Sequence, residues 1–267
     1  MSGARDWLKQ RKMKAMRGPF NPSANDEWGL LIDGFDVPQY LMTPYNPPYY
    51  ADFMDRFGLR KATDWFEYIC RFPKEPPGTA AAAAQFARNK FPDLAIRKID
   101  MGSIKTESKI FREIYNSSLG ENWAFVPMTG EEMDKMVERL RPLVVPSLVL
   151  IAEVKGEPVG LIAFIPNYNE VLKRLNGRLF PFGIFKFLYY SKKIKSLFLP
   201  VLGVKKEYRM FGIEAAMYCE ALKNGVALGF EEFGTSLILE NNLAPRKAAE
   251  AFGGEAAKKY RIYEIAI

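Results

Sequence analysis

The chain contains no histidine among its 267 residues. This absence excludes Ser-His-Asp triads, histidine metal sites and histidine general bases, so a base would have to be a carboxylate, a tyrosine or a bound water. Only two cysteines are present, Cys70 and Cys219, and neither has a partner at metal-binding spacing. We interpret both as buried thiols and expect no metal; such cysteine use fits a reduced, cytoplasmic compartment.

Long apolar runs are also missing. No segment reaches the roughly 18 apolar residues of a membrane span, and the N-terminus lacks the apolar core of a signal peptide. The net charge of +7 permits anionic partners such as CoA phosphates, nucleic acid or a membrane surface. Because lysines and arginines are spread along the chain, we expect a solvated basic surface and no nucleic-acid partner.

A segment rich in structure breakers, Arg71-Phe-Pro-Lys-Glu-Pro-Pro-Gly78, divides the chain. It indicates a linker, and the alanine run at 80–84 after it predicts a helix. We expect a partial unit at 1–70, a linker and helix at 71–93, and a larger domain at 94–267. The larger domain should contain a strand at 94–99, helices near 107–117 and 131–140, and a hairpin over 147–165.

The most informative segment is 202–214, Leu-Gly-Val-Lys-Lys-Glu-Tyr-Arg-Met-Phe-Gly-Ile-Glu. A strand-like run at 195–204 precedes Arg209-x-x-Gly212, and a helix-like run at 213–228 follows it. The motif therefore lies where a strand becomes a helix. Unpaired N–H groups at a helix N-terminus can hold a phosphate, and Gly212 permits close backbone approach because it has no Cβ.

This spacing, Leu202-x-Val204-x(4)-Arg209-x-x-Gly212, resembles the acyl-CoA loop of the GCN5-related N-acetyltransferases (GNAT). The segments 236–242, 246–254 and 259–267 are similar to the next strand, helix and closing strand of that family. The resemblance implies an α+β fold, a GNAT-like mixed sheet flanked by helices over about 94–267, with strands near 197–204 and 234–240 that diverge at their ends. The whole chain also resembles a bacterial group of tandem acetyltransferase-like proteins, through segments at 18–23, 29–35 and 45–50.

The family further implies an acyl-CoA-dependent N-acyltransferase that uses acetyl-CoA or a longer acyl-CoA and acts on an amine of a small molecule or peptide. A bulge in the family's strand would place the Val204 N–H to polarise the thioester. Glu240 is the candidate base, Glu153 a second carboxylate, and Tyr208 the candidate acid for the thiolate. The residues assigned to the cofactor are Leu202, Gly203, Val204, Arg209, Met210, Phe211, Gly212, Ile213 and Asn242.

Three positions depart from the family pattern. Glu214 stands where Gly or Ala is usual, and Lys206 where many members have Pro. Ala249 occupies the position of the Tyr that reprotonates the CoA thiolate in many members. These departures leave open an alternative, a non-catalytic acyl-CoA-binding or scaffold protein. An oligomer is compatible with either function.

An insertion at 167–195 carries four phenylalanines followed by lysines: Phe180, Phe182, Phe185, Phe187, Lys192, Lys193 and Lys195. Three interpretations remain open. The rings could pack on their own domain, form a lid over an apolar substrate, or contact a membrane interface. In the lid interpretation the rings line the acyl or acceptor pocket, and longer acyl chains should bind better than acetyl.

The first 70 residues contain a weak repeat of the C-terminal end. Asn46 and Gly58 are twelve positions apart, as are Asn242 and Gly254. Each pair brackets a predicted helix, 47–57 or 243–252, which ends in Phe-Gly and leads to an aromatic strand. The N-terminal part therefore resembles the back half of a second acetyltransferase-like domain, either truncated or dependent on the intact domain to cover an open sheet.

Overall fold

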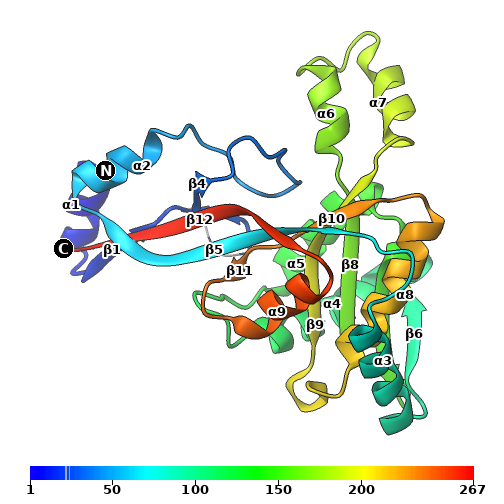
Figure 1. Cartoon of the computed structure of the whole chain (residues 1–267). Coiled ribbons are helices and arrows are strands. Elements are labelled where there is room, and N and C mark those ends of the chain that lie inside the picture. Colours follow the sequence, from blue (N-terminus) through cyan, green and yellow to red (C-terminus); the bar gives the residue numbers. More distant parts are fainter. Residues whose placement is uncertain (22, 24) are drawn as a thin grey trace. The chain divides into compact units, whose positions relative to one another are not determined.

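The computed structural model describes residues 1–21, 23 and 25–267 (Figure 1). They form two compact units: unit 1 consists of Met1–Ile69 and Leu237–Ile267, and unit 2 of Cys70–Ser236. The ranges 1–70, 71–93 and 94–267 divide the chain differently and stay a prediction of domain organisation. Within the segment at 18–23 that resembles the tandem group, Pro22 lies outside the described residues.

Unit 2 is built on a mixed sheet in the order β10-β9-β8-β7-β6. β10 and β9 are parallel, and the other neighbours are antiparallel. Its strands are β6 (Ala95–Lys98), β7 (Val149–Val154), β8 (Glu157–Pro166), β9 (Ser196–Val204) and β10 (Glu232–Thr235). The predicted hairpin is β7–β8, joined at Lys155 and Gly156. Both residues have positive φ angles, 54° and 80°, as a type I′ turn requires.

Helices flank this sheet, so the predicted α+β class, a mixed sheet flanked by helices, is confirmed. The α-helices of unit 2 are α3 (Gly78–Lys90), α4 (Ile104–Leu119), α5 (Gly130–Leu140), α6 (Asn169–Leu175), α7 (Gly183–Ser191) and α8 (Ile213–Ala227); the 3-10 turns are η1 (Met101–Ser103), η2 (Arg141–Leu143), η3 (Pro146–Leu148) and η4 (Lys206–Tyr208). A reciprocal capping box between Thr129 and Glu132 starts α5. The apolar face of α4 buries Ile114 against Ile151 and Leu161 of the sheet, which fixes this helix beside β8 and β9.

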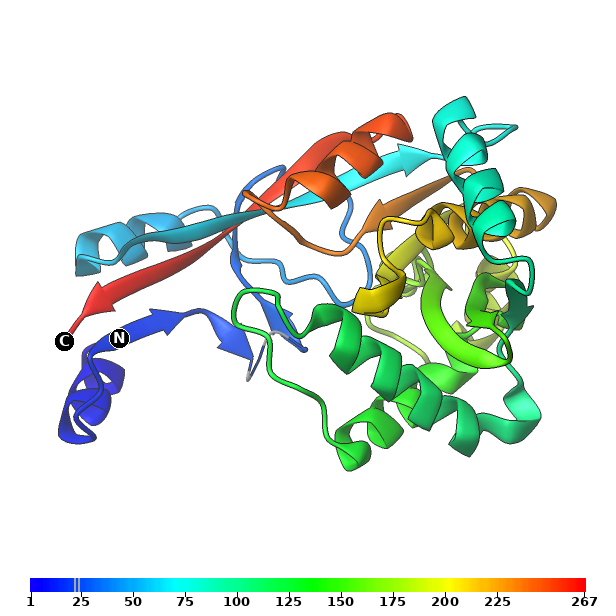
Figure 2. The ribbon, with the colours of Figure 1, turned by 90° about the horizontal axis from the view of Figure 1, so that it is seen from below.

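Unit 1 contains long antiparallel strands, of which β5 and β12 run side by side (Figure 1 and Figure 2). Its elements are α1 (Ser2–Gln10), β1 (Ala15–Gly18), β2 (Phe20–Asn21), β3 (Glu27–Trp28), β4 (Leu30–Asp33), α2 (Tyr50–Phe57), β5 (Arg60–Arg71, whose last two residues begin unit 2), β11 (Ile238–Leu239), α9 (Leu243–Ala251) and β12 (Glu255–Ala266). β12 also pairs with β1 and β4, and β11 pairs with β5. Trp65, Tyr260 and Tyr263 are buried in this unit.

The predicted helix–strand repeat is present in unit 1. α2 ends at Gly58, whose φ is 93°, and leads into β5; α9 is followed by Gly253, whose φ is 72°, and leads into β12. The strand predicted at 259–267 does not close the sheet of unit 2. Among the described residues it pairs with β1, β4 and β5, because the repeat supplies a strand of matching length as its neighbour.

Candidate functional site

The loop at 205–212 joins β9 to α8 within unit 2, as the sequence predicts. Positive φ angles at Met210 (66°) and Gly212 (82°) turn the chain sharply into the helix. The first hydrogen bond of α8 runs from the Ala216 N–H to the Gly212 carbonyl at 3.0 Å. By helix geometry, the N–H groups of Ile213, Glu214 and Ala215 therefore have no carbonyl acceptor within α8, although the Glu214 carboxylate accepts a bond from its own N–H. This helix end has the backbone donors and dipole that favour an anion.

The C-terminal half of β9 presents one side to β8 and the other away from it. The Lys205 N–H donates to the Val159 carbonyl at 2.8 Å, and antiparallel alternation then directs the N–H groups of Leu202 and Val204 away from β8. The Val204 carbonyl agrees with this, because it accepts a bond from Arg209 Nε at 3.2 Å. Pairing between β9 and β10 ends at Leu199 opposite Thr235. The two strands are therefore neighbours that part before Val204, as the sequence predicts. The strand predicted at 234–240 is not continuous, because β10 ends at Thr235 and Ile238–Leu239 form β11, which pairs with β5.

The bulge predicted at Val204 is wrong. The register between β8 and β9 shifts between Phe198 and Val201, so the irregularity lies at Leu199 and Pro200. Pro200 has no N–H to donate to a neighbouring strand, which explains the break at this position. Without the bulge, the predicted role of Val204 in polarising a thioester rests on the direction of its N–H group, which points away from β8.

Arg209 is bound by the chain itself. Besides the bond to Val204, its Nη2 donates to the Ser118 carbonyl at 2.6 Å, and its Nη1 lies 3.3 Å from a Glu121 carboxylate oxygen. Ser118 belongs to the last turn of α4, where carbonyls lack helical partners and attract a cation. Arg209 therefore fastens the loop to the end of α4 in addition to placing a positive charge beside α8.

The two lysines of the loop are also paired. Lys205 bonds Glu113, and Lys206 bonds Glu121 at 2.5 Å, an interaction that lowers the pKa of Glu121. Burial raises the pKa of Glu214 despite the nearby charge of Arg209. A phosphate at this loop would therefore compete with the carboxylates of Glu113 and Glu121 for the lysines and Arg209.

Helix α3, which sequence reasoning interpreted as simple helix after a linker, supports the loop. A Cβ on Gly212 would lie 2.2 Å from the Ala83 carbonyl oxygen, so this glycine is required by α3 itself. The Phe91 ring, at the end of α3, packs on Tyr208 and Phe211 with centroids 5.7 and 5.6 Å away. The sequence did contain a signal for this packing, namely small residues at helical spacing. Ala80, Ala84 and Ala87 are buried where α3 packs against α8.

The remaining predicted residues of the loop have packing roles or lie open. A Cβ on Gly203 would lie 2.3 Å from Ser118 Oγ, so this glycine admits α4 close to β9. Ile213 is fully buried, whereas Leu202 is half-buried and Met210 is exposed. The structure thus gathers the residues predicted at 202–204 and 208–213 around one loop.

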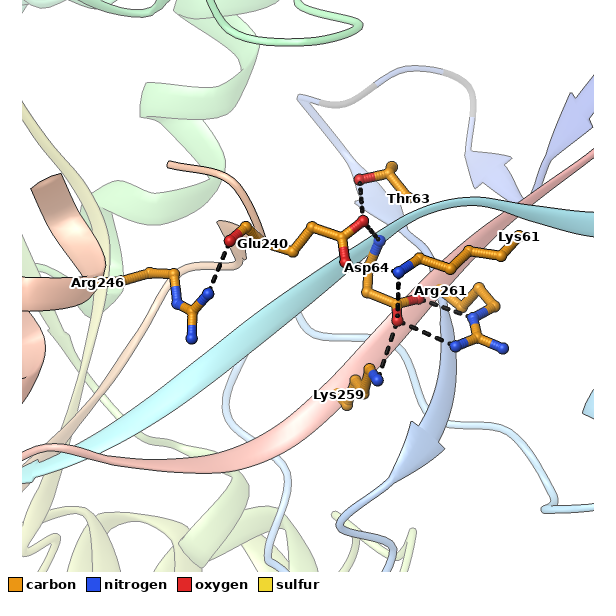
Figure 3. A network of polar contacts seen from close by, with 7 residues as sticks. All are labelled: Lys61, Thr63, Asp64, Glu240, Arg246, Lys259 and Arg261. Carbon is orange, nitrogen blue, oxygen red and sulfur yellow. Dashed lines mark hydrogen bonds and ion pairs between the residues drawn. The ribbon is translucent and has the colours of Figure 1, made fainter. Parts of the chain in front are cut away.

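Glu240 and Asn242 belong to unit 1. The Glu240 carboxylate accepts bonds from Lys61 Nζ at 2.6 Å and from the Asp64 N–H at 3.1 Å (Figure 3). Burial opposes its ionisation, but these bonds outweigh burial and lower the pKa of Glu240. A carboxylate with a lowered pKa is a weak base, so the geometry disfavours the predicted catalytic role. Asn242 stands at the N-cap of α9, where its N–H donates to the Leu239 carbonyl.

Figure 3 shows the charged network that surrounds Glu240 in unit 1. Its centre is Asp64, whose side chain is 1% exposed and is held by Arg261 through two bonds of 2.7 and 3.0 Å. Lys259 and Lys61 lie 3.0 and 3.2 Å from the same carboxylate. Burial raises the pKa of Asp64, but these cations lower it to about 2. The network stabilises the β5–β12 pair.

Glu153, the second carboxylate considered as a base, lies on β7 in unit 2. Its carboxylate bonds Arg97 Nε at 2.7 Å, and the same guanidinium bonds the buried Glu107 at 2.8 Å. This pairing ties β6 and β7 to α4.

Comparison with known proteins identifies the family. No family model matches the chain. The chain is 33% identical over 270 residues to the bacterial ceramide synthase of Caulobacter vibrioides (strain NA1000 / CB15N). This alignment covers 99% of this chain and 70% of that protein. It is 34% identical over 270 residues to protein YghO of Escherichia coli (strain K12), with 98% of this chain and 68% of that protein covered. The chain belongs to the family of these two proteins.

Solved structures show the same fold at lower identity. A GCN5-related N-acetyltransferase from Sphaerobacter thermophilus superimposes with a TM-score of 0.59 at 15% identity, over 99% of this chain and 66% of that one. A tandem GNAT protein from the clavulanic acid biosynthesis pathway gives a TM-score of 0.51 at 9% identity, over 99% and 68% of the two chains. These likenesses confirm the GNAT fold. Among the described residues, no helix has both the length and the apolar character needed to cross a bilayer.

Proposed function

We propose that this protein is an N-acyltransferase that moves an acyl group from acyl-CoA to the amine of a long-chain amino lipid. The observation that carries this proposal is the 33% identity, over 99% of the chain, to a protein named bacterial ceramide synthase. A ceramide is the amide of a fatty acid and a long-chain amino alcohol, so its synthesis joins an activated acyl group to an amine. This acceptor is narrower than the amine of a small molecule or peptide that the sequence implies.

The loop at 205–212 supports acyl-CoA as the donor. The first turn of α8 offers N–H groups that no helical carbonyl accepts to a diphosphate, and the outward side of β9 offers the N–H groups of Leu202 and Val204 to an extended pantetheine arm. In this mechanism the Val204 N–H would polarise the thioester carbonyl as the amine attacks. We propose Tyr208 as the acid for the departing thiolate, since Ala249 cannot supply the usual hydroxyl.

A transfer assay tests the proposal. Acetyl-, octanoyl- and palmitoyl-CoA are each combined with a long-chain amino alcohol, ethanolamine or a peptide, and CoA release is followed with a thiol reagent. We expect release with the long-chain amine and an amide of the matching mass. Tyr208→Phe keeps the ring packed on Phe91 and removes only the hydroxyl, so it should lower kcat by roughly 10²-fold while acyl-CoA binding is retained.

A second candidate function is favoured by Ala249, which is buried where many GNAT proteins have the tyrosine acid. It is an acyl-CoA-binding protein without transfer activity. Calorimetric binding of acyl-CoA with no CoA release from any amine would support this candidate and reject the transferase. Absence of acyl-CoA binding would reject both.

A further inference from the structure

The insertion between β8 and β9 forms a helical hairpin, α6–α7, that projects beyond the ends of these two strands (Figure 1). Its inner face is packed: Val171 and Leu175 of α6 are buried, and the Phe187 ring stacks on Tyr168 with centroids 5.8 Å apart and planes 9° apart. Gly183 is buried, and a Cβ there would lie 2.2 Å from the Arg178 carbonyl oxygen. The hairpin therefore closes on itself and needs no further partner for its inner face.

The outer face of the hairpin is apolar and faces solvent. Phe180, Phe182 and Phe185 are 79%, 72% and 68% exposed. In α7, Phe185, Leu188 and Tyr189 fall on one side at helical spacing, and the last two are exposed as well. Single exposed apolar residues are ordinary on a protein surface, but a contiguous group of large rings marks an interaction site. Three of the four phenylalanines are therefore not the packed core of their own domain.

Charge separates the occupants that such a face could have. Residues 171–195 contain seven lysines and arginines and no aspartate or glutamate. The hairpin and the lysines that follow it, residues 169–195, therefore hold these seven basic residues and one acidic residue, Glu170, which together account for +6 of the chain's net charge of +7. Two copies of such a surface repel each other, which disfavours a dimer through this face. Exposed rings surrounded by cations match an anionic lipid surface, where rings enter the acyl boundary and cations meet the headgroups.

We propose that the α6–α7 hairpin docks this protein on the surface of anionic membranes, with Phe180, Phe182 and Phe185 inserted at the interface. The hairpin lies on the bilayer and does not cross it. This inference rests on α6 and α7 alone, so it holds or fails independently of the proposed transfer reaction.

Vesicle flotation with the full chain tests the proposal. Neutral phosphatidylcholine vesicles are compared with vesicles that contain phosphatidylglycerol, and the partition coefficient of the protein is measured on each. We expect the wild type to bind the anionic vesicles and to be released by high salt. Phe182→Ser/Phe185→Ser should lower the partition coefficient on anionic vesicles at least about tenfold. Lys192→Gln/Lys193→Gln should lower it by about tenfold or more, because two cations are lost from the face that meets the headgroups.

The matched control is Phe86→Ser, which removes an exposed phenylalanine from α3 in the same unit and should leave partitioning unchanged. Phe185→Trp adds a reporter whose emission should shift to the blue only with anionic vesicles. Equal partitioning of the wild type and the two-ring variant would overturn the proposal, as would a Phe86→Ser effect of the same size. So would light scattering that shows the rings holding an oligomer together in the absence of lipid.

Discussion

Gly212 offers the sharpest test of how the loop at 205–212 is held. With a φ of 82°, an alanine there costs about 1–2 kcal/mol of backbone strain. Its Cβ would also lie 2.2 Å from the Ala83 carbonyl oxygen of α3, so the helices would have to separate by nearly an ångström. Overpacking of this kind costs roughly 1–3 kcal/mol. We therefore expect Gly212→Ala to lower the free energy of unfolding by about 2–5 kcal/mol in urea titrations.

Gly229, just beyond the end of α8, supplies the control. Its φ is also 82°, but no described atom lies within 4 Å of the position of its Cβ. Gly229→Ala should therefore show the strain without the collision, about 1–2 kcal/mol. The difference between the two variants measures the contact between α3 and α8. If they differ by less than about 0.5 kcal/mol, the contact does not hold the loop. Calorimetry should also show weaker acyl-CoA binding for Gly212→Ala and unchanged binding for Gly229→Ala.

Three further predictions concern charged residues. Arg209→Ala should weaken acyl-CoA binding at least about tenfold in calorimetry; Arg209→Lys keeps the charge but not the bonds to two carbonyls, so wild-type affinity in both variants would exclude this arginine from binding. Asp64→Asn should lower the free energy of unfolding by at least about 2 kcal/mol at pH 7, because the pKa of Asp64 is lowered to about 2 in the folded protein. This contribution to stability is present above pH 4 and is lost as the pH falls through 2. An acid titration should show the loss in the wild type and not in Asp64→Asn. Burial raises the pKa of Glu67 to about 7 even though Lys258 lies 3.4 Å away, so native stability should fall as the pH rises from about 4.5 to 7; Glu67→Gln should remove this fall, and a wild type whose stability rises over the same range would contradict the assignment.

Features encoded by neighbouring residues could be predicted from the sequence. The turn at Lys155 and Gly156, the strand before Val204 and the helix after Gly212 all follow from local pattern, and the structure has each of them. Gly212 was predicted to permit close backbone approach, and the structure shows that the backbone of α3 makes such an approach. A Cβ on Gly212 meets Ala83, more than a hundred positions earlier in the chain, and no local pattern reveals such a partner.

Other misses had a signal that was available. Pro200 inside a predicted strand is itself a sign of a bulge, since proline cannot donate to a sheet ladder.

The roles of Glu240 and Arg209 could not be predicted, because Lys61 and Ser118, which bind them, come from distant segments. Sequence identifies a candidate acid or base by residue type, whereas its pKa and its availability depend on such partners.

The weak sequence repeat gains a physical meaning from the pairing of β5 with β12. The two helices end in the dipeptides Phe57-Gly58 and Phe252-Gly253, and a shift of 195 positions (252 minus 57) takes the first dipeptide to the second. The register of β5 and β12 contains two bulges, one at Ala62 of β5 and the other at Ala257 of β12, and the same shift relates them.

It also relates Trp65 to Tyr260, which pair with each other midway between the bulges. An antiparallel pair whose irregularities exchange under one shift has an approximate twofold axis at its centre. Two similar helix–strand halves that pair in this way cover each other's open edges, and an unpaired strand edge is what each half would expose alone. The N-terminal segment therefore contributes structurally to unit 1.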